Sequence, residues 1–203
     1  MAPLPRTKVK DHDSRLLKIG VVVVDNDEII IGLLTNVLKK LGFKKIYQAR
    51  DGFQAVEILN SQTIDLVITD WELAPLPDSI ASNSISPSDK WGANPPENGA
   101  RFVQYVRGSE NSQNPYLPII MLTGNALRHN VEYARDSGVD DILVKPVSAG
   151  DLCSRLIKIV NATRFFINAS TYKGPCRRRK ASSVPPEEER RKTIPQVIPQ
   201  RLT

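Results

Sequence analysis

Short apolar runs alternate with amphipathic stretches between residues 19 and 161. Most of these runs are rich in β-branched residues and end at a polar residue. Apolar runs of this kind are typical of parallel strands that are covered on both faces of a sheet. The pattern predicts five strands, at residues 19–24, 45–49, 66–69, 118–122 and 141–144.

The stretches between the runs carry apolar residues at helical spacing. In the first stretch these residues share one helix face, and they are Ile30, Leu33, Leu34, Val37, Leu38 and Leu41. Asp27 is the expected N-cap of this helix, and Gly42 is expected to end it. Further helices are predicted from Asp51 and Gly52, from Gly99, over 126–137 before Gly138, and from Ser148 to about residue 161. Five strand–helix units in succession predict an α/β fold with a doubly wound parallel sheet.

Two segments depart from the alternating pattern. Residues 73–98 show no clear period and contain five prolines between Pro75 and Pro96, which indicates a long insertion. From Tyr172 onward, Pro, Arg, Lys and Glu dominate. We therefore expect a flexible arm at 1–16, one domain at 17–162 with an insertion at about 76–98, and a basic, Pro-rich, disordered tail at 163–203.

The net charge of +6 over 203 residues belongs to the ends of the chain. Residues 1–18 and 173–203 are both basic, whereas residues 19–172 carry a charge of −3. The charge alone therefore gives little reason to expect nucleic-acid binding by the domain. No apolar stretch reaches the roughly 18 residues of a membrane helix, and the N-terminus lacks the apolar segment of a secretory signal. Two cysteines, Cys153 and Cys176, make no disulfide scaffold, so we expect a cytoplasmic protein.

Polar residues follow several of the predicted strands. The first strand ends at Asp25, the third at Asp70, the fourth at Thr123 and the fifth at Lys145. The carboxyl ends of parallel strands meet at one edge of the sheet, where sites of doubly wound proteins lie. Converging carboxylates suit Mg²⁺, and a hydroxyl and an ammonium suit a transferring phosphoryl group. Asp70 is a candidate nucleophile, since carboxylates can form an aspartyl phosphate.

The segments that carry these residues resemble the receiver domain of two-component response regulators. The resemblance covers residues 17–162 and rests on VVVVDNDE (21–28), LKKLGF (38–43), ARDGFQAVEIL (49–59), DLVITDWEL (65–73), PIIMLTGNA (118–126) and GVDDILVKPV (138–147). It implies a flavodoxin-like fold with the strand order 2-1-3-4-5. It also implies that Asp70 is the phosphoacceptor, that Thr123 is the switch hydroxyl and that Lys145 pairs with the phosphoryl group. The implied Mg²⁺ ligands are Asp25, Asn26, Asp70 and the backbone carbonyl of Glu72.

The resemblance also implies a function in a phosphorelay. A histidine kinase or a histidine phosphotransfer protein would supply the phosphoryl group, and the domain would catalyse only its own phosphorylation and dephosphorylation. A downstream protein would then bind the face formed by the fourth helix, fifth strand and fifth helix of the predicted units. A homodimer is compatible with this scheme. About 40 residues follow the last predicted helix, so we expect a stand-alone receiver without an output domain.

Three positions depart from the family pattern. Asn26 replaces a carboxylate, so we expect weaker Mg²⁺ binding. Ile142 stands where the family has an aromatic switch residue. In the family this aromatic side chain swings inward as the threonine moves toward the phosphoryl group, and an isoleucine weakens the expectation of that coupling here. The loop after Asp70 is much longer than usual: it is either a tolerated surface insertion or a flap that selects partners, with Trp91 as its anchor. Glu72 and Asn125 flank the site, where the family tunes the lifetime of the phosphoryl group.

Two other functions fit parts of the sequence. VVVVDND also fits the opening of haloacid-dehalogenase-like phosphatases, with Asp25 as nucleophile and Asp27 as acid/base. That alternative leaves Asp70 without a role, and only Asp151, on a helix, follows Lys145 as a further acid. The basic clusters at 177–180 and 190–192 also allow a nucleic-acid or anionic-surface binder, although charge is the only feature that favours it.

Overall fold

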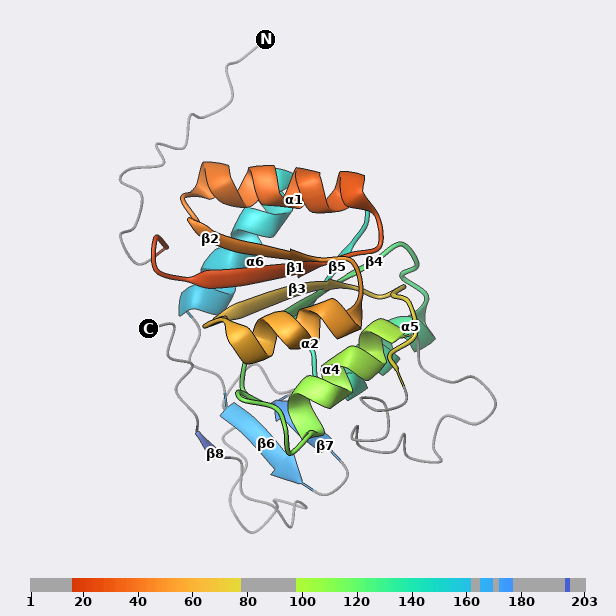
Figure 1. Ribbon diagram of the computed structural model, residues 1–203. Helices are drawn as coiled ribbons and strands as arrows, with labels where there is room; N and C mark the ends of the chain where they lie inside the picture. Colours follow the sequence, from red (N-terminus) through yellow and green to blue (C-terminus); the bar gives the residue numbers. More distant parts are fainter. Residues whose placement is uncertain (1–15, 78–97, 162–164, 170–171, 177–195, 198–203) are drawn as a thin grey trace.

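A five-stranded parallel sheet forms the centre of the molecule (Figure 1). The computed structural model describes residues 16–77, 98–161, 165–169, 172–176 and 196–197. The sheet has the order β2-β1-β3-β4-β5, and each neighbouring pair is parallel. Its strands are β1 (Gly20–Val24), β2 (Lys45–Ala49), β3 (Leu66–Asp70), β4 (Ile119–Thr123) and β5 (Asp141–Val144). The predicted fold and strand order are therefore confirmed.

Helices cover both faces of this sheet (Figure 1). One face packs against α1 (Glu28–Leu41) and α6 (Ala149–Asn161). The other face packs against α2 (Gly52–Ser61), α4 (Asn98–Gly108) and α5 (Arg128–Ser137). Alternate residues of each strand enter opposite hydrophobic clusters, as Val22 and Val23 do, because successive strand side chains point to opposite faces. Every residue of β1, β3 and β4 is buried, which explains their continuous apolar runs.

The helix ends follow the predicted local signals. The Asp27 carboxylate accepts a hydrogen bond from the Ile29 N–H and caps α1, whereas Gly42 ends it at a φ of 106°. Gly138 ends α5 at a φ of 103°, and the Ser148 hydroxyl accepts from the Asp151 N–H at the start of α6. Positive φ values of this size favour glycine, since a side chain would clash with the backbone. Among the described residues, no helix is long and apolar enough to cross a membrane.

The expected disordered tail is wrong for part of its length. The strands β6 (Phe165–Ala169) and β7 (Tyr172–Pro175) form an antiparallel hairpin, and β8 (Gln196–Val197) pairs with β6. The hairpin is ordered because Phe166 is buried against the domain, with a relative exposure of 3%. The basic clusters lie outside the described residues, as do residues 78–97 of the predicted insertion at about 76–98, with Trp91, and the N-terminal residues 1–15.

Candidate functional site

Side chains from the ends of three strands meet at the carboxyl edge of the sheet. The Lys145 Nζ atom lies 2.8 Å from Asp25 Oδ2 and 2.9 Å from Asp70 Oδ1. Asp25 directly follows β1, Asp70 ends β3, and Lys145 directly follows β5. The structure therefore brings together three of the residues that the sequence singled out, although they are up to 120 positions apart.

Burial shapes the charges of this cluster. Asp25 is 0% and Asp70 4% exposed. Burial raises the pKa of Asp70 above its ordinary value and the negative charge of Asp25 adds to the effect, against the lowering effect of Lys145. Burial by itself would lower the pKa of Lys145, but hydrogen bonds and charge attraction from the two carboxylates raise it above its usual value. Lys145 thus remains an ammonium that balances one of two carboxylates, and the cluster can accept further positive charge.

The backbone fixes Asp25 at the rim. Its N–H donates to the Ala49 carbonyl over 3.1 Å, which extends the pairing of β1 with β2. Its Oδ1 atom accepts from the Asp27 N–H over 2.9 Å. One carboxylate oxygen is therefore held by the backbone while the other faces Lys145, and this orients the side chain.

The backbone around Asp70 is packed closely against α4. The Trp71 N–H donates to the Leu122 carbonyl over 2.8 Å, and the Gly99 N–H donates to the Trp71 carbonyl over 3.0 Å. A Cβ atom on Gly99 would lie only 2.2 Å from the Asp70 carbonyl oxygen. Only glycine allows this approach, so the first turn of α4 supports the loop that carries Asp70.

Thr123 lies at the same edge, and its hydroxyl hydrogen bonds within its own loop. Its Oγ1 atom donates to the Asn125 carbonyl over 2.9 Å and accepts from the Asn125 N–H over 3.1 Å. The Lys145 N–H donates to the Thr123 carbonyl over 2.8 Å, which joins the ends of β4 and β5. Thr123 and Lys145 therefore lie side by side at the ends of two adjacent strands.

The residues expected to complete a metal site are exposed. Asn26 follows Asp25 and Glu72 follows Trp71, and both are open to solvent. In the part of the chain that the structure describes, no three His, Cys, Asp or Glu side chains form a group that could hold a metal ion. The oxygen donors here are two carboxylates, an amide and a backbone carbonyl. These hard ligands are suited to Mg²⁺, with one charge fewer than three carboxylates would supply.

An aromatic contact next to Asp70 was not predicted from the sequence. Trp71 is buried and meets Tyr133 of α5 edge to face, with ring centroids 6.1 Å apart. Burial raises the pKa of Tyr133 to about 12. Ile142, which stands where the receiver family has an aromatic residue, is half-buried. It packs against the hydrophobic cluster that contains Trp71 and Tyr133. The position of Trp71 directly after a candidate nucleophile was the available signal.

Comparisons with known proteins agree with this geometry. The family model for the response regulator receiver domain matches residues 21–77, which include Asp25 and Asp70. The described domain is therefore a CheY-like receiver domain. The receiver domain is 27% identical to chemotaxis protein CheY-3 of Vibrio cholerae over 139 residues, which are 68% of this chain and 89% of that protein. Chemotaxis protein CheY of Pseudomonas aeruginosa is also 27% identical over 139 residues and is covered to 94%.

Solved structures share the fold of this receiver domain. V. cholerae CheY4 matches with a TM-score of 0.54 and 23% identity over 70% of this chain and 98% of that chain. The receiver domain of the sensor histidine kinase PA1611 from P. aeruginosa matches with a TM-score of 0.54 and 24% identity over 71% of this chain and 98% of that chain. That structure holds a magnesium ion in its active site cleft. The receiver family consists of signalling domains and not of conventional enzymes.

The contacts of the other acids give no support to the phosphatase alternative. The Asp27 carboxylate caps α1, and Asp151 on α6 accepts a hydrogen bond from the Ser148 hydroxyl. Both Asp27 and Asp151 therefore hydrogen bond at the start of a helix, whereas Asp70 forms an ion pair with Lys145.

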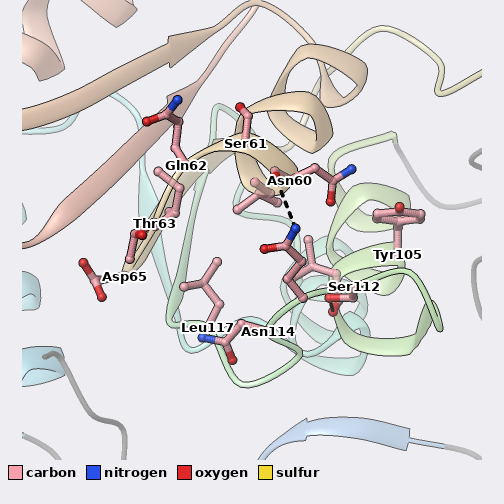
Figure 2. A pocket seen from close by; sticks show the side chains of 13 residues that line it. Asn60, Ser61, Gln62, Thr63, Asp65, Tyr105, Ser112, Asn114 and Leu117 are labelled. Carbon is pink, nitrogen blue, oxygen red and sulfur yellow. Dashed lines mark hydrogen bonds between the residues drawn. The ribbon is translucent and has the colours of Figure 1, made fainter.

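A pocket of about 410 Å³ lies at the opposite end of the receiver domain (Figure 2). It is formed by the segments that lead into β3 and β4, and the Gln113 side chain donates to the Asn60 carbonyl across it. Asp65 is the acid in its lining; burial raises the pKa of this group, and its carboxylate accepts from the Gly20 N–H. This pocket contains none of the predicted site residues.

Proposed function

We propose that Asp70 of this receiver domain accepts a phosphoryl group from a phosphohistidine donor. The donor is a histidine kinase or a histidine phosphotransfer protein. In the transfer, the bond between phosphorus and the histidine nitrogen breaks, and the nitrogen leaves with the bonding electron pair. A bond between phosphorus and an Asp70 carboxylate oxygen forms. The ion pair of Asp70 with Lys145 at a buried strand end is the observation that carries this proposal.

Lys145 and Thr123 are proposed to stabilise the phosphoryl group. Since Lys145 is also bound to Asp25, its ammonium remains at the site when Asp70 is modified, and it can pair with a phosphoryl oxygen. Thr123 can donate its hydroxyl proton to another oxygen once it leaves the Asn125 carbonyl. The Lys145 ammonium and the Thr123 hydroxyl would thus each contact an oxygen that carries negative charge during phosphoryl transfer.

We infer that Asp25, Asn26, Asp70 and the backbone carbonyl of Glu72 hold Mg²⁺. The two carboxylates share one ammonium, so a divalent cation would reduce their mutual repulsion. When bound, Mg²⁺ neutralises charge on the transferring phosphoryl oxygens. The magnesium ion of the PA1611 receiver domain supports this assignment. Asn26 is expected to make the binding weaker than a second adjacent carboxylate would.

The output is proposed to be a change in partner binding at the face formed by α5, β5 and α6. Each element, or the residue leading into it, presents an exposed apolar side chain, and these are Leu127, Val144 and Ile157. Phosphorylation would shift this face between two conformations with different affinities for a downstream protein or a second copy of the chain. We propose that the domain acts in the cytoplasm and catalyses only its own phosphorylation and dephosphorylation.

Labelling with a small acyl phosphate tests the phosphoacceptor. With Mg²⁺ we expect one acid-stable, base-labile phosphoryl adduct, which Asp70→Asn abolishes. Asp27→Asn is the matched control, because asparagine also caps helices well and Asp27 is not a proposed ligand. Continuous turnover that survives in Asp70→Asn and is lost in Asp27→Asn would support the phosphatase alternative instead.

A further inference from the structure

The C-terminal hairpin of β6 and β7 packs against the end of the domain that lies far from Asp70. Figure 1 shows β6 and β7 beneath α4, and β7 packs against both α4 and α5. Phe166 inserts its ring at this end and meets Tyr116 edge to face, with centroids 4.9 Å apart. A Cβ atom on Gly138, at the end of α5, would lie 2.8 Å from the Lys173 carbonyl oxygen. The backbone of the hairpin therefore packs closely against the C-terminal end of α5, and a shift of that end would bring the two into collision.

Arg107 joins these elements from beneath the hairpin. Its side chain is 1% exposed and donates hydrogen bonds to the carbonyls of Gly138, Pro115 and Leu117. It also pairs with the buried Asp140 carboxylate at 3.0 Å. The Phe166 ring covers the guanidinium at 5.3 Å. Arg107 thus fixes the ends of α4 and α5 and the starts of β4 and β5 in one arrangement, and Phe166 shields that arrangement from water.

The opposite ends of the same two helices meet the phosphoacceptor region. The N–H of Gly99, in the first turn of α4, donates to the Trp71 carbonyl next to Asp70. The loop from Thr123 to Leu127 leads into α5, and Tyr133 of α5 contacts the Trp71 ring. Helices of 10 and 11 residues span roughly 15–17 Å and act as stiff connections between the two ends.

Phosphorylation must disturb this arrangement if Thr123 turns toward the phosphoryl group. The hydroxyl would give up its hydrogen bond to the Asn125 carbonyl, which holds the loop before α5. Leu127 provides no side-chain cap that would hold the first turn of α5 in place. A shift of α5 would then reach Gly138, where the hairpin leaves little room.

We propose that the hairpin is a clamp that favours the unphosphorylated state, so that its docking and the phosphorylation of Asp70 oppose each other. This inference rests on the proposed function of Asp70. Coupling between two sites is reciprocal: phosphorylation loosens the hairpin, and loosening the hairpin promotes phosphorylation. The hairpin then acts as an intramolecular output of the receiver domain.

Two adjacent phenylalanines provide the test. Phe166→Ala removes the ring over Arg107, whereas Phe165→Ala, at a residue 45% exposed, is the matched control. Steady-state phosphorylation of the full chain by a small acyl phosphate is measured at several donor concentrations. We expect the half-saturating concentration to fall by about fivefold or more in Phe166→Ala, in the range of ordinary coupling energies, and to stay unchanged in Phe165→Ala.

A second variant keeps the test valid if Phe166→Ala folds poorly. A Cβ atom on Gly174 would lie 2.9 Å from Gly138 Cα, so Gly174→Ala should loosen docking in the same direction, whereas Gly32→Ala enters open space. Hydrogen exchange of the backbone amides in β6 (165–169) and in residues 172–176 should quicken on phosphorylation of the wild-type chain. Unchanged phosphorylation in both loosened variants, with a normal wild-type adduct, would overturn the clamp alone. A wild-type chain without any adduct would overturn the proposed function and the clamp together.

Discussion

The Nζ atom of Lys145 lies 2.9 Å from Oδ1 of Asp70 at the carboxyl edge of the sheet. The same ammonium lies 2.8 Å from Asp25, so one cation holds two buried carboxylates in place. Each carboxylate would otherwise repel the other in a medium where charges are poorly screened. This contact places a positive charge beside the proposed nucleophile before any phosphoryl group arrives.

Removal of that charge should slow phosphorylation. In Lys145→Met, the transferring phosphoryl group loses a charged hydrogen bond worth about 1.5–3 kcal/mol. We expect the rate of adduct formation on Asp70 to fall roughly 10- to 100-fold, measured as a time course with a small acyl phosphate and Mg²⁺. Lys145→Arg keeps the charge and should retain more of the rate. Equal rates in Lys145→Met and the wild-type chain would exclude this role for Lys145.

A carboxylate at position 26 should tighten Mg²⁺ binding. Asn26→Asp adds one negative charge next to Asp25, and we expect the dissociation constant to fall roughly tenfold, which corresponds to about 1.4 kcal/mol. Isothermal titration calorimetry with Mg²⁺ measures this dissociation constant. Asn36→Asp makes the same chemical change on the exposed face of α1 and should leave the constant unaltered. If Asn26→Asp binds no more tightly than the wild-type chain, residue 26 is not a metal ligand.

The packing of α4 against the Asp70 loop predicts a stability effect at Gly99. In Gly99→Ala, the new Cβ atom would collide with the Asp70 and Trp71 backbone, so the free energy of unfolding should fall by roughly 1–3 kcal/mol. Gly32→Ala adds the same atom in open space within α1, where alanine should stabilise the helix by about 0.5–1 kcal/mol. Urea denaturation compares the two variants. A Gly99→Ala chain as stable as the wild type would show that α4 does not hold the loop in the described position.

Asp141 should make stability depend on pH in the acid range. Burial by itself raises its pKa, but the Ile142 N–H, Lys158 and Arg155 together lower it below the ordinary 3.8. Because the folded-state pKa lies below the unfolded one, the ionised carboxylate stabilises the fold above pH 3.8, and this contribution is lost as the pH falls through the folded-state value. Asp141→Asn should therefore cost about 1 kcal/mol of unfolding free energy at neutral pH and progressively less below pH 3.8.

The control for this pH effect is an exposed ion pair. Glu132→Gln removes the partner of Arg128, whose side chain is almost wholly exposed, so no measurable change is expected at any pH. Urea denaturation at a series of pH values gives both comparisons. A cost of Asp141→Asn that stays constant down to the acid limit would contradict the assigned direction of the pKa shift.

Much of the sheet and its site was predictable from the sequence because their signals are local. A strand buried on both faces must be apolar throughout, and polar residues such as Asp25 and Lys145 then mark where each strand ends. Helix boundaries follow from Asp27, Gly42 and Gly138, whose capping roles depend on neighbouring backbone alone.

The hairpin was not predictable because its stability depends on distant partners. Residues 165–169 form too short a run to indicate a buried strand inside a polar tail, and Phe166 is ordered by Tyr116 and Arg107, which lie far away in the sequence. Arg107 shares a helix face with the buried Ala100 and Val103, but a charged residue type by itself predicts exposure to solvent. Its burial depends on carbonyl groups that only the folded chain brings together.

Transfer of a phosphoryl group from a phosphohistidine to Asp70 is the reaction on which the proposed function depends. The most direct measurement mixes a histidine phosphotransfer protein, radiolabelled on its phosphohistidine, with this chain in the presence of Mg²⁺. We predict that base-labile label moves to the wild-type chain and that none moves to Asp70→Asn. Label that stays on the donor, or that moves equally to Asp70→Asn, would show that Asp70 is not the phosphoacceptor.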